Sequence, residues 1–570
     1  MNYIENYKKW IDSEVVNEDI RKELLAIQNN DAEIQERFHK NLEFGTGGLR
    51  GIIGAGTNRI NIYTVRKATQ GLANFINLSS SNNSKGVAIA YDSRHFSEVF
   101  AEVAALVLAA NNIKAYVFDS LRPTPELSFA VRHLNCDAGI VITASHNPSE
   151  YNGYKVYGAD GGQITLDMAN AIISEIDKLD IFDDVKSCEK EEAIKKQLLS
   201  YIGEDIDQEY LNNVTQLSIN PNISHEVNDF KIVYTPLHGT GLMPIERTLR
   251  MLGYNDLHIV ESQKFPDGDF PTVKSPNPEE SEALAEGIKL AESLSADIVL
   301  GTDPDSDRVG VAVRNREGNY RLLTGNQIGA LLTHYLVSNK RGINSRDAVI
   351  KTIVTSELGA NIAKAYGATV FDTLTGFKFI GEKIKEFEEK DTYNFLFGYE
   401  ESYGYLAGTF VRDKDAVISS VLIVEMAAVY KLHGLTLLDG INKIYQKYGY
   451  HSDALDSFTF KGIFGQDKIK SIMNKFRNNN MLIEELPDIR IIEDFKLQIR
   501  YDVTTSQHDR IELPSSNVIK IYFTDGSWFA VRPSGTEPKL KIYYSAVAKN
   551  SESANVRINL IKDRISQFIV

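Results

Sequence analysis

The chain has 570 residues, 43% of them hydrophobic and 24% charged, and this length predicts roughly three to five globular domains. Its formal net charge of −15 argues against a nucleic-acid partner or an anionic membrane surface, because both need a basic face. The two cysteines, Cys136 and Cys188, are too few for a disulfide framework or a zinc site and fit a reducing cytoplasm. The N-terminus lacks the apolar core of a signal peptide. The longest apolar stretch, residues 416–432, is interrupted by Glu425, so we expect a buried helix there and no membrane span.

The first 50 residues contain a helical pattern followed by a glycine-rich run. Residues 1–40 predict one or two amphipathic helices. Residues 44–51 (FGTGGLRG) allow backbone amides to approach an anion, with Arg50 as a charged arm. The run lacks the spacing of a Walker loop or of a dinucleotide-binding loop, so it is a weak signal by itself.

A pattern of strand, helix, strand and strand then occurs three times, which indicates an internal repeat at the scale of a domain. Strands that alternate with helices of this length predict mostly parallel sheets with right-handed crossovers. Each copy closes on a polar loop. The predicted elements are residues 87–91, 97–110, 114–118 and 140–143, then 231–234, 243–252, 257–260 and 297–300, and finally 348–354, 358–366, 369–371 and 394–397.

The last part of the chain breaks this pattern, because its strands at residues 501–503, 518–523 and 528–531 are typical of an antiparallel sheet. We therefore expect an α/β protein with three consecutive, mixed but mostly parallel domains of similar topology, a C-terminal α+β domain, and one central cleft. The expected boundaries are residues 1–205, 206–323, 324–450 and 451–570.

A serine loop, residues 143–148 (TASHNP), follows the predicted strand at residues 138–142. Ligands bind at the carboxyl ends of strands in open α/β sheets. Ser145 is a candidate nucleophile there, with His146 and Lys155 as candidates for proton transfer. A polar turn before Pro148 is the plainer interpretation of these residues alone.

Three aspartates, Asp303, Asp305 and Asp307, occupy alternate positions after another apolar strand. This spacing lets a tight loop direct three carboxylates at one hard cation, and Mg²⁺ partnered by a phosphate oxygen suits it. An EF-hand loop is excluded, because Arg308 and Arg314 stand where it needs glycine and glutamate. The alternative is an acidic surface turn.

A phosphate-binding loop is indicated at residues 532–536 (RPSGT). Arg532 offers a bidentate guanidinium, Ser534 and Thr536 offer hydroxyls, and Gly535 exposes backbone amides. An ordinary hairpin turn is the alternative.

Two further stretches are expected to join the cleft. Residues 373–378 (TLTGFK) supply Thr375, Gly376 and Lys378, and we favour Lys378 over His238 of residues 235–241, because a phosphorylated sugar needs cations. Arg412 and Lys414 form either a cationic pair or a solvated turn.

The serine loop, the aspartate loop, residues 398–402 (GYEES) and residues 532–538 (RPSGTEP) occur in this order, and together they resemble the α-D-phosphohexomutase family, the phosphoglucomutases and phosphomannomutases. The resemblance covers nearly the whole chain. It implies that Ser145 carries the transferable phosphoryl group, with Mg²⁺ held between that group and the aspartates. The implied substrate contacts are Glu400 and Ser402 to sugar hydroxyls, Arg532, Ser534, Gly535 and Thr536 to the non-reacting phosphate, and Arg50, His146, Lys155 and Arg308 around the reacting phosphoryl group.

Two points stay open within this resemblance. A lysine beside cations and a metal has a lowered pKa that suits a general base, so Lys155 is preferred, with His146 as its rival. The family more often has Gly-Glu-x-Ser-Gly-His at the sugar loop, whereas this chain has Tyr399 before the glutamate and Tyr403 and Tyr405 after the serine. These tyrosines leave the choice of sugar open.

The implied activity is the interconversion of hexose 1-phosphate and 6-phosphate, with glucose preferred, through a phosphoserine enzyme and glucose 1,6-bisphosphate. Mannose and pentose phosphates are alternatives with the same chemistry. A non-catalytic phosphosugar-binding protein and a metal-dependent hydrolase are alternatives of other classes. No obligate protein partner is expected.

Overall fold

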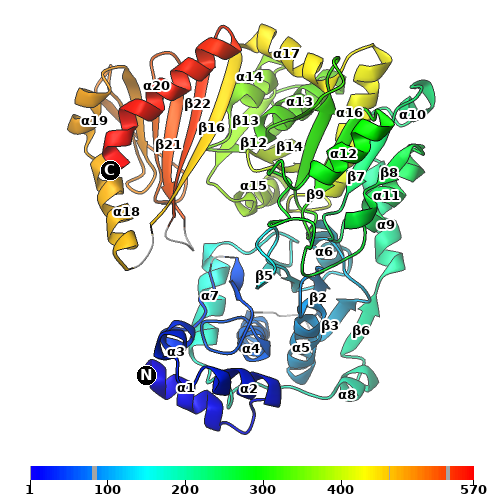
Figure 1. Ribbon diagram of the computed structural model, residues 1–570, viewed down its shortest axis with the longest axis vertical. Helices are drawn as coiled ribbons and strands as arrows, with labels where there is room; N and C mark the ends of the chain where they lie inside the picture. Colours follow the sequence, from blue (N-terminus) through cyan, green and yellow to red (C-terminus); the bar gives the residue numbers. More distant parts are fainter. Residues whose placement is uncertain (1, 46, 80–85, 461–462, 535–538, 570) are drawn as a thin grey trace. The chain divides into compact units, whose positions relative to one another are not determined.

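The computed structural model describes residues 2–45, 47–79, 86–460, 463–534 and 539–569. The chain forms two compact units (Figure 1). The first contains Met1–Ile328 and Phe377–Thr436, and the second contains Gly329–Gly376 and Leu437–Val570. Helix α13 (Gly325–Asn339) runs across one of the boundaries.

The chain begins with three short helices, α1 (Tyr3–Asp12), α2 (Glu18–Ala26) and α3 (Asp31–Phe38). The expectation of one or two helices is therefore wrong. Asn2, Asn17 and Asn30 each accept a hydrogen bond from a backbone amide at a helix start, so each asparagine begins a new helix. The helices bury Trp10 and Phe38, whose rings meet edge to face.

The first sheet, within the described chain, has six strands in the order β1-β5-β4-β2-β3-β6. β4, β2, β3 and β6 are parallel, whereas β1 and β5 pair antiparallel at one side. All residues of β2 and β4 are buried, and α5 and α6 both pack on these strands. The elements are β1 (Gly48–Ile52), α4 (Ile62–Ser79), β2 (Gly86–Tyr91), α5 (Ser97–Ala110), β3 (Lys114–Phe118), α6 (Thr124–His133), β4 (Ala138–Ile142), β5 (Tyr151–Gly158), α7 (Leu166–Asp177), α8 (Lys190–Lys195) and β6 (Leu199–Ile202).

Part of the glycine-rich run, expected as a loop, forms the edge strand β1. The φ angle of Gly48 is 128°, and a Cβ atom at this position would lie 1.8 Å from the carbonyl oxygen of Tyr154 on β5. Glycine is needed here because the two strand backbones approach too closely for any side chain.

The second sheet has five described strands in the order β11-β10-β9-β7-β8. β8, β7 and β9 are parallel, and β10 returns antiparallel to β9, so the aspartate loop is the turn of a hairpin. The elements are α9 (Glu204–Thr215), α10 (Ile223–Glu226), β7 (Ile232–Thr235), α11 (Leu242–Met251), β8 (Leu257–Ile259), the 3₁₀ helix η1 (Glu261–Gln263), α12 (Ala285–Leu294), β9 (Ile298–Thr302), β10 (Val309–Arg314) and β11 (Tyr320–Leu322).

The first unit is completed by α15 (Phe377–Lys390), the antiparallel pair β14 (Asn394–Glu400) and β15 (Gly404–Ala407), and α16 (Ala416–Leu432). α16 is the expected buried helix, and it packs on α9, α10, α11 and β15. Across the described chain, we find no single helix that is long and apolar enough to cross a membrane.

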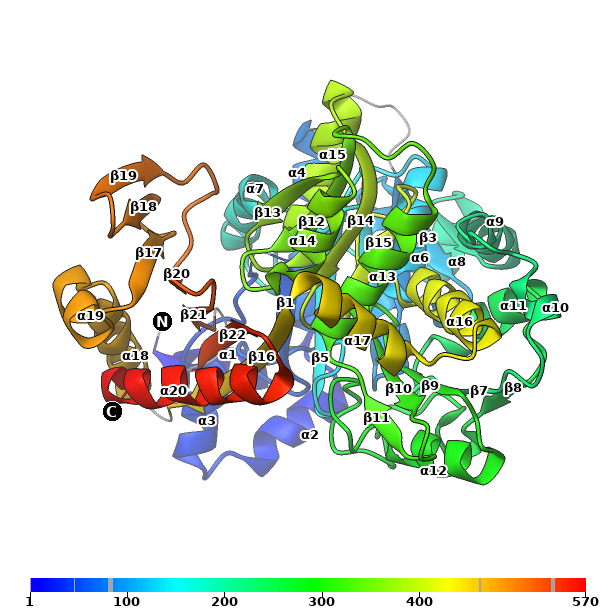
Figure 2. The same cartoon turned by 90° about the horizontal axis from the view of Figure 1, so that it is seen from above.

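The second unit contains a seven-stranded antiparallel sheet in the order β16-β22-β21-β20-β17-β18-β19 among its described residues. α20 packs across β16 and β22, and Figure 2 shows β18 and β19 at the other end of the sheet. The elements are the parallel pair β12 (Asp347–Thr352) and β13 (Thr369–Thr373), with α14 (Glu357–Ala365), α17 (Leu437–Tyr448), β16 (Tyr450–Thr459), α18 (Ile463–Phe476), α19 (Asn479–Glu485), β17 (Ile489–Asp494), β18 (Ile499–Asp502), β19 (Gln507–Arg510), β20 (Ile519–Phe523), β21 (Trp528–Pro533), β22 (Lys539–Ala548) and α20 (Ser551–Ile569).

These sheets confirm the expected fold class, with mixed α/β sheets followed by an antiparallel C-terminal sheet. The three copies of the repeat also have the expected order of strand, helix, strand and strand.

A substitution at Gly48 tests the close approach of β1 to β5. We expect Gly48→Ala to destabilise the first unit by more than about 2 kcal/mol, because the new methyl group overlaps a backbone carbonyl that cannot move without breaking the sheet. Gly342→Ala is the matched control, since Gly342 has a φ of 70° but no neighbour within 4 Å of the added Cβ. Differential scanning calorimetry should show a larger fall in Tm for Gly48→Ala; equal falls would contradict the packing argument.

Candidate active site

The serine loop connects β4 to β5 and places the side chain of Ser145 inside the protein. Ser145 has a φ of 54°, a left-handed conformation that costs a residue other than glycine roughly 1–2 kcal/mol. Its amide donates to Oγ1 of Thr143 at 2.8 Å, and its hydroxyl donates to Oδ2 of Asp303 at 2.8 Å. Oγ of Ser145 also lies 3.2 Å from Nδ1 of His146. The hydroxyl is therefore directed at the aspartate loop.

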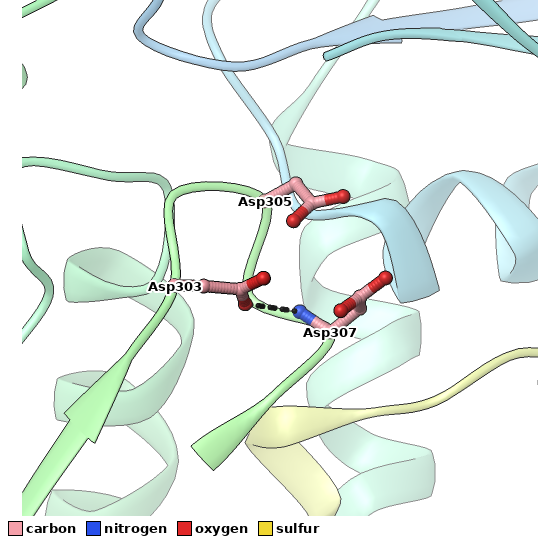
Figure 3. A group of neighbouring side chains, drawn as sticks. All are labelled: Asp303, Asp305 and Asp307. Atoms are coloured by element: carbon pink, nitrogen blue, oxygen red, sulfur yellow. Dashed lines mark hydrogen bonds between the residues drawn. The ribbon is translucent and has the colours of Figure 1, made fainter. Parts of the chain in front are cut away.

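The aspartate loop brings three buried carboxylates together at the tip of the β9–β10 hairpin. One oxygen from each of Asp303, Asp305 and Asp307 lies within 4.8 Å of the others, and Figure 3 shows the side chains on the same side of the loop. Oδ1 of Asp303 accepts the amides of Asp307 at 3.1 Å and Arg308 at 3.0 Å, which fixes the turn. The alternative of an acidic surface turn is wrong, because each of the three aspartates is at most 2% exposed.

These carboxylates repel one another strongly. Burial, together with the charges of Asp305 and Asp307, raises the pKa of Asp303 well above its usual value. Burial acts on Asp305 in the same direction, but Lys155 outweighs it and holds the pKa of Asp305 below its usual value. The loop therefore needs cations beside it.

The residues present fit a divalent cation. Oδ1 of Asp305 and Oδ1 of Asp307 are buried and accept no hydrogen bond, so each carboxylate keeps an oxygen for a ligand. Three carboxylates in a tight loop are the hard oxygen donors that Mg²⁺ prefers. The hydroxyl of Ser145 faces the same loop, which suits a cation shared with a phosphoryl group.

Two lysines supply positive charge to the loop. Nζ of Lys155, on β5, donates to Oδ2 of Asp305 at 2.7 Å and lies 3.5 Å from Oδ2 of Asp307. Nζ of Lys414 lies 3.1 Å from the same oxygen of Asp307. Lys414 and Arg412 are mostly buried and ion-paired, Arg412 with Glu388, so the interpretation of this stretch as a solvated turn is wrong.

The carboxylates act on Lys155 in the direction opposite to the lowered pKa that was expected beside cations and a metal. Burial opposes the charged ammonium, but the carboxylates of Asp305 and Asp307 outweigh burial and raise the pKa. By contrast, burial, together with the charges of Arg308 and Arg50, lowers the pKa of His146 well below its usual value. A sequence does not reveal which charges will be nearest to each group.

Arg50 and Arg308 are the two arginines expected near Ser145, one before it and one after it in the sequence. Arg50, on β1, is exposed and donates to Oδ1 of Asn147 in the serine loop at 3.1 Å. Arg308, which follows the aspartates, donates to Oε1 of Glu279 at 2.7 Å. Glu279 was not expected from the sequence, because its loop has no motif of its own.

The loop that contains Glu400 and Ser402 is the turn from β14 to β15, and it contacts the aspartate hairpin. β14 continues to Glu400, which is 4% exposed, and Ser402 lies in the turn that follows. The amide of Val309 donates to the carbonyl of Tyr403 at 3.2 Å. Loops from three successive parts of the chain therefore meet within the first unit.

Lys378 lies near the start of α15. It lines a cavity of about 450 Å³ with Asp160, Thr165 and Glu382, and the cavity lining within the described chain does not include Ser145 or the aspartates. Burial lowers the pKa of Lys378 to about 8. His238 instead hydrogen bonds to the carbonyl of Phe265 and to Thr272, which is a structural role.

The remaining expected residues belong to the second unit. Thr375 and Gly376 follow β13, and Gly376 has a φ of 119°. Arg532 lies on β21, and the amide of Ser534 donates to the carbonyl of Lys539 at 2.7 Å. Gly535 and Thr536 lie outside the described residues.

Thr124 is a site residue that sequence reasoning missed. It begins α6, and its hydroxyl donates to Oδ2 of Asp305 at 2.9 Å, while its amide donates to the carbonyl of the same aspartate. The only sequence signal is Pro125 at the start of a helix, which predicts the helix and not the contact.

Four domain families match the chain in order: phosphoglucomutase/phosphomannomutase α/β/α domain I at residues 41–181, domain II at 208–318, domain III at 324–448, and the C-terminal domain at 484–557. A phosphoglucomutase of Staphylococcus epidermidis is 40% identical over 554 residues, 96% of this chain and 98% of its own. One of Staphylococcus aureus is 41% identical over 540 residues, 93% and 94% of the two chains.

The fold is also similar to that of a solved structure. The Paramecium phosphoprotein pp63/parafusin, a phosphoglucomutase in an open form, superposes with a TM-score of 0.71 at 17% identity, over 93% of this chain and 95% of its own. At this identity the similarity concerns the fold alone. With four matching domains and close relatives over nearly its whole length, the chain belongs to the phosphoglucomutase/phosphomannomutase family.

Proposed function

We propose that this protein is a phosphoglucomutase, which interconverts glucose 1-phosphate and glucose 6-phosphate through a phosphoserine at Ser145. The observation that carries the proposal is the hydrogen bond of 2.8 Å from the Ser145 hydroxyl to Asp303, inside a buried group of three carboxylates. A phosphosugar-binding protein needs no such hydroxyl. The relatives named as phosphoglucomutases support glucose as the sugar.

The aspartates would hold the divalent cation, for which we propose Mg²⁺. A phosphoserine carries close to two negative charges and would be repelled by Asp303, Asp305 and Asp307 without a cation between them. When bound, the cation neutralises charge on the phosphoryl oxygens, which is the main requirement of phosphoryl transfer.

In the proposed reaction, a free sugar hydroxyl attacks the phosphorus of phosphorylated Ser145. A bond from phosphorus to the sugar oxygen forms, the bond to Oγ of Ser145 breaks, and the proton of the sugar hydroxyl passes to a base. The product is glucose 1,6-bisphosphate, which turns over in the site and returns its other phosphoryl group to Ser145. Lys155, beside the aspartates, and His146, 3.2 Å from the serine oxygen, are the two candidates for moving this proton.

The other family residues would hold the sugar and its second phosphate. We propose that Glu400 and Ser402 bind sugar hydroxyls, that Arg50 and Arg308 bind the reacting phosphoryl group, and that the second phosphate is held at the C-terminal domain. The residues proposed for the second phosphate and for the rest of the substrate are Thr375, Gly376, Lys378, Lys414, Arg532, Ser534, Gly535 and Thr536.

The unusual tyrosines of the sugar loop are packing residues. Tyr399 and Tyr405 are at most 1% exposed, and the Tyr405 hydroxyl donates to the carbonyl of Gly325 at 3.2 Å. They therefore leave the proposed sugar contacts to Glu400 and Ser402. The free cysteines, Cys136 and Cys188, fit the cytoplasm, which we propose as the location.

The first test is the conversion of glucose 1-phosphate to glucose 6-phosphate with Mg²⁺ and a trace of glucose 1,6-bisphosphate. We expect Ser145→Ala to lower kcat by about 10⁴-fold or more, because no other group occupies the acceptor position. Ser293→Ala, in an exposed serine on α12, is the control and should match the wild type. Mannose 1-phosphate and ribose 1-phosphate assayed in parallel should turn over more slowly.

An active Ser145→Ala variant would refute the phosphoserine mechanism. Release of inorganic phosphate at a rate comparable to isomerisation would favour the hydrolase alternative instead.

A second test concerns the cation. We expect EDTA to abolish turnover and Mg²⁺ to restore it, and we expect Mg²⁺ to raise the Tm of the wild type by relieving the repulsion among the aspartates. The stabilisation should approach about 2.7 kcal/mol when free Mg²⁺ is about 100 times its Kd. Asp305→Asn should lose this Mg²⁺-dependent rise in Tm, whereas Asp256→Asn, on the surface, should keep it. An identical rise in both variants would place the cation elsewhere.

A further inference from the structure

Arg94 lies beneath the serine loop and is 3% exposed. It follows β2, and its guanidinium donates to four carbonyl oxygens, three in the serine loop and one at the start of β5. One terminal nitrogen donates to Pro148 at 2.8 Å and Tyr151 at 3.0 Å. The other donates to Ser145 at 2.5 Å and to Asn147. One side chain therefore spans the whole loop from β4 to β5.

Other bonds also hold the backbone of the loop. The Ser145 amide donates to Oγ1 of Thr143 at 2.8 Å, the Ser275 hydroxyl donates to the carbonyl of His146 at 2.9 Å, and the Ile53 amide donates to the carbonyl of Glu150 at 2.8 Å. None of these bonds involves the carbonyl of Ser145. Because Ser145 is in the left-handed region, the surrounding structure must hold it there. The carbonyl of Ser145 accepts a hydrogen bond from Arg94, which links this side of the serine backbone to the residues that follow β2.

Arg94 is itself held rigidly by neighbours that are not part of the serine loop. Oδ2 of Asp92 lies 3.4 Å from Nε of Arg94, and both side chains are fully buried. Oδ1 of Asp92 accepts the Arg94 amide at 3.0 Å and the Ser97 hydroxyl at 2.8 Å. The guanidinium also lies 5.0 Å from the ring centroid of Phe270. These contacts hold the guanidinium of Arg94 in place before any substrate binds.

We propose that Arg94 is a positioning residue for phosphoryl transfer, which holds the Ser145 backbone in the conformation that directs its hydroxyl at Asp303. Arg94 touches only main-chain carbonyls of this loop and acts through Ser145, so the proposal rests on the proposed function of that serine. Lysine cannot replace it, because a single ammonium cannot reproduce the planar fork that reaches four acceptors.

The experiment compares Arg94→Ala and Arg94→Lys with Arg37→Ala. Arg37 is a matched control, because its guanidinium is also largely buried and donates to a backbone carbonyl, that of Ala55, but among the N-terminal helices. We expect kcat to fall about 100-fold or more in both Arg94 variants with KM within about 3-fold of the wild type. Millimolar guanidinium should restore part of kcat to Arg94→Ala, and methylammonium should not. Arg37→Ala should have a lower Tm, nearly normal kcat and no response to guanidinium.

Hydrogen exchange of the amides at residues 143–153 tests the same inference without any assay of turnover. Exchange should be faster in both Arg94 variants than in the wild type and unchanged in Arg37→Ala. If Arg94→Ala does not fold, Arg94→Lys supplies both measurements. Unchanged exchange in this segment, or a kcat like that of Arg37→Ala, would overturn the proposal. Full activity of Ser145→Ala, combined with faster exchange in the Arg94 variants, would refute the proposed function of Ser145. In that case Arg94 would still be shown to hold the loop.

Discussion

The site depends on the repulsion between three buried carboxylates at the tip of one hairpin. Asp303, Asp305 and Asp307 are held together by the fold, and their charges are costly without cations nearby. Lys155 and Lys414 supply two such charges from other strands and loops. The hydroxyl of Ser145 lies in the same group. A phosphoryl group on this hydroxyl would therefore lie beside carboxylates that attract cations.

The fold meets this constraint by bringing the ends of separate strands together. β4 leads to the serine, β9 to the aspartates and β14 to Glu400, and Ser145 and Asp303 are 158 residues apart in the sequence. Hydrogen bonds from Thr124 to Asp305 and from Val309 to Tyr403 join the loops directly. The rigid sheets therefore set the geometry, and the loops carry the chemistry.

Sequence reasoning placed Ser145 and the aspartates at the ends of strands, where the structure has them, but it described their surroundings poorly. The position of Ser145 and of the aspartates followed from apolar strands and from residue type, which are local properties. The pKa of Lys155 did not follow, because two aspartates about 150 residues further along the chain outweigh its burial. For Arg412 and Lys414 the sequence left a cationic pair and a solvated turn open, because the residues that pair with them, Glu388 and Asp307, belong to other elements.

The sequence by itself determined the repeated α/β pattern, the antiparallel last part and the motifs of the site, because periodicity and motif spacing are written along the chain. Only the tertiary structure decided that β1 is an edge strand against β5, that Arg94 lies under the serine loop, and that two lysines pair with the aspartates. These features depend on which buried donors and acceptors meet after the sheets form. Which donors and acceptors meet is decided by three-dimensional packing, because residues far apart in the sequence pair with one another's charges and hydrogen-bonding groups.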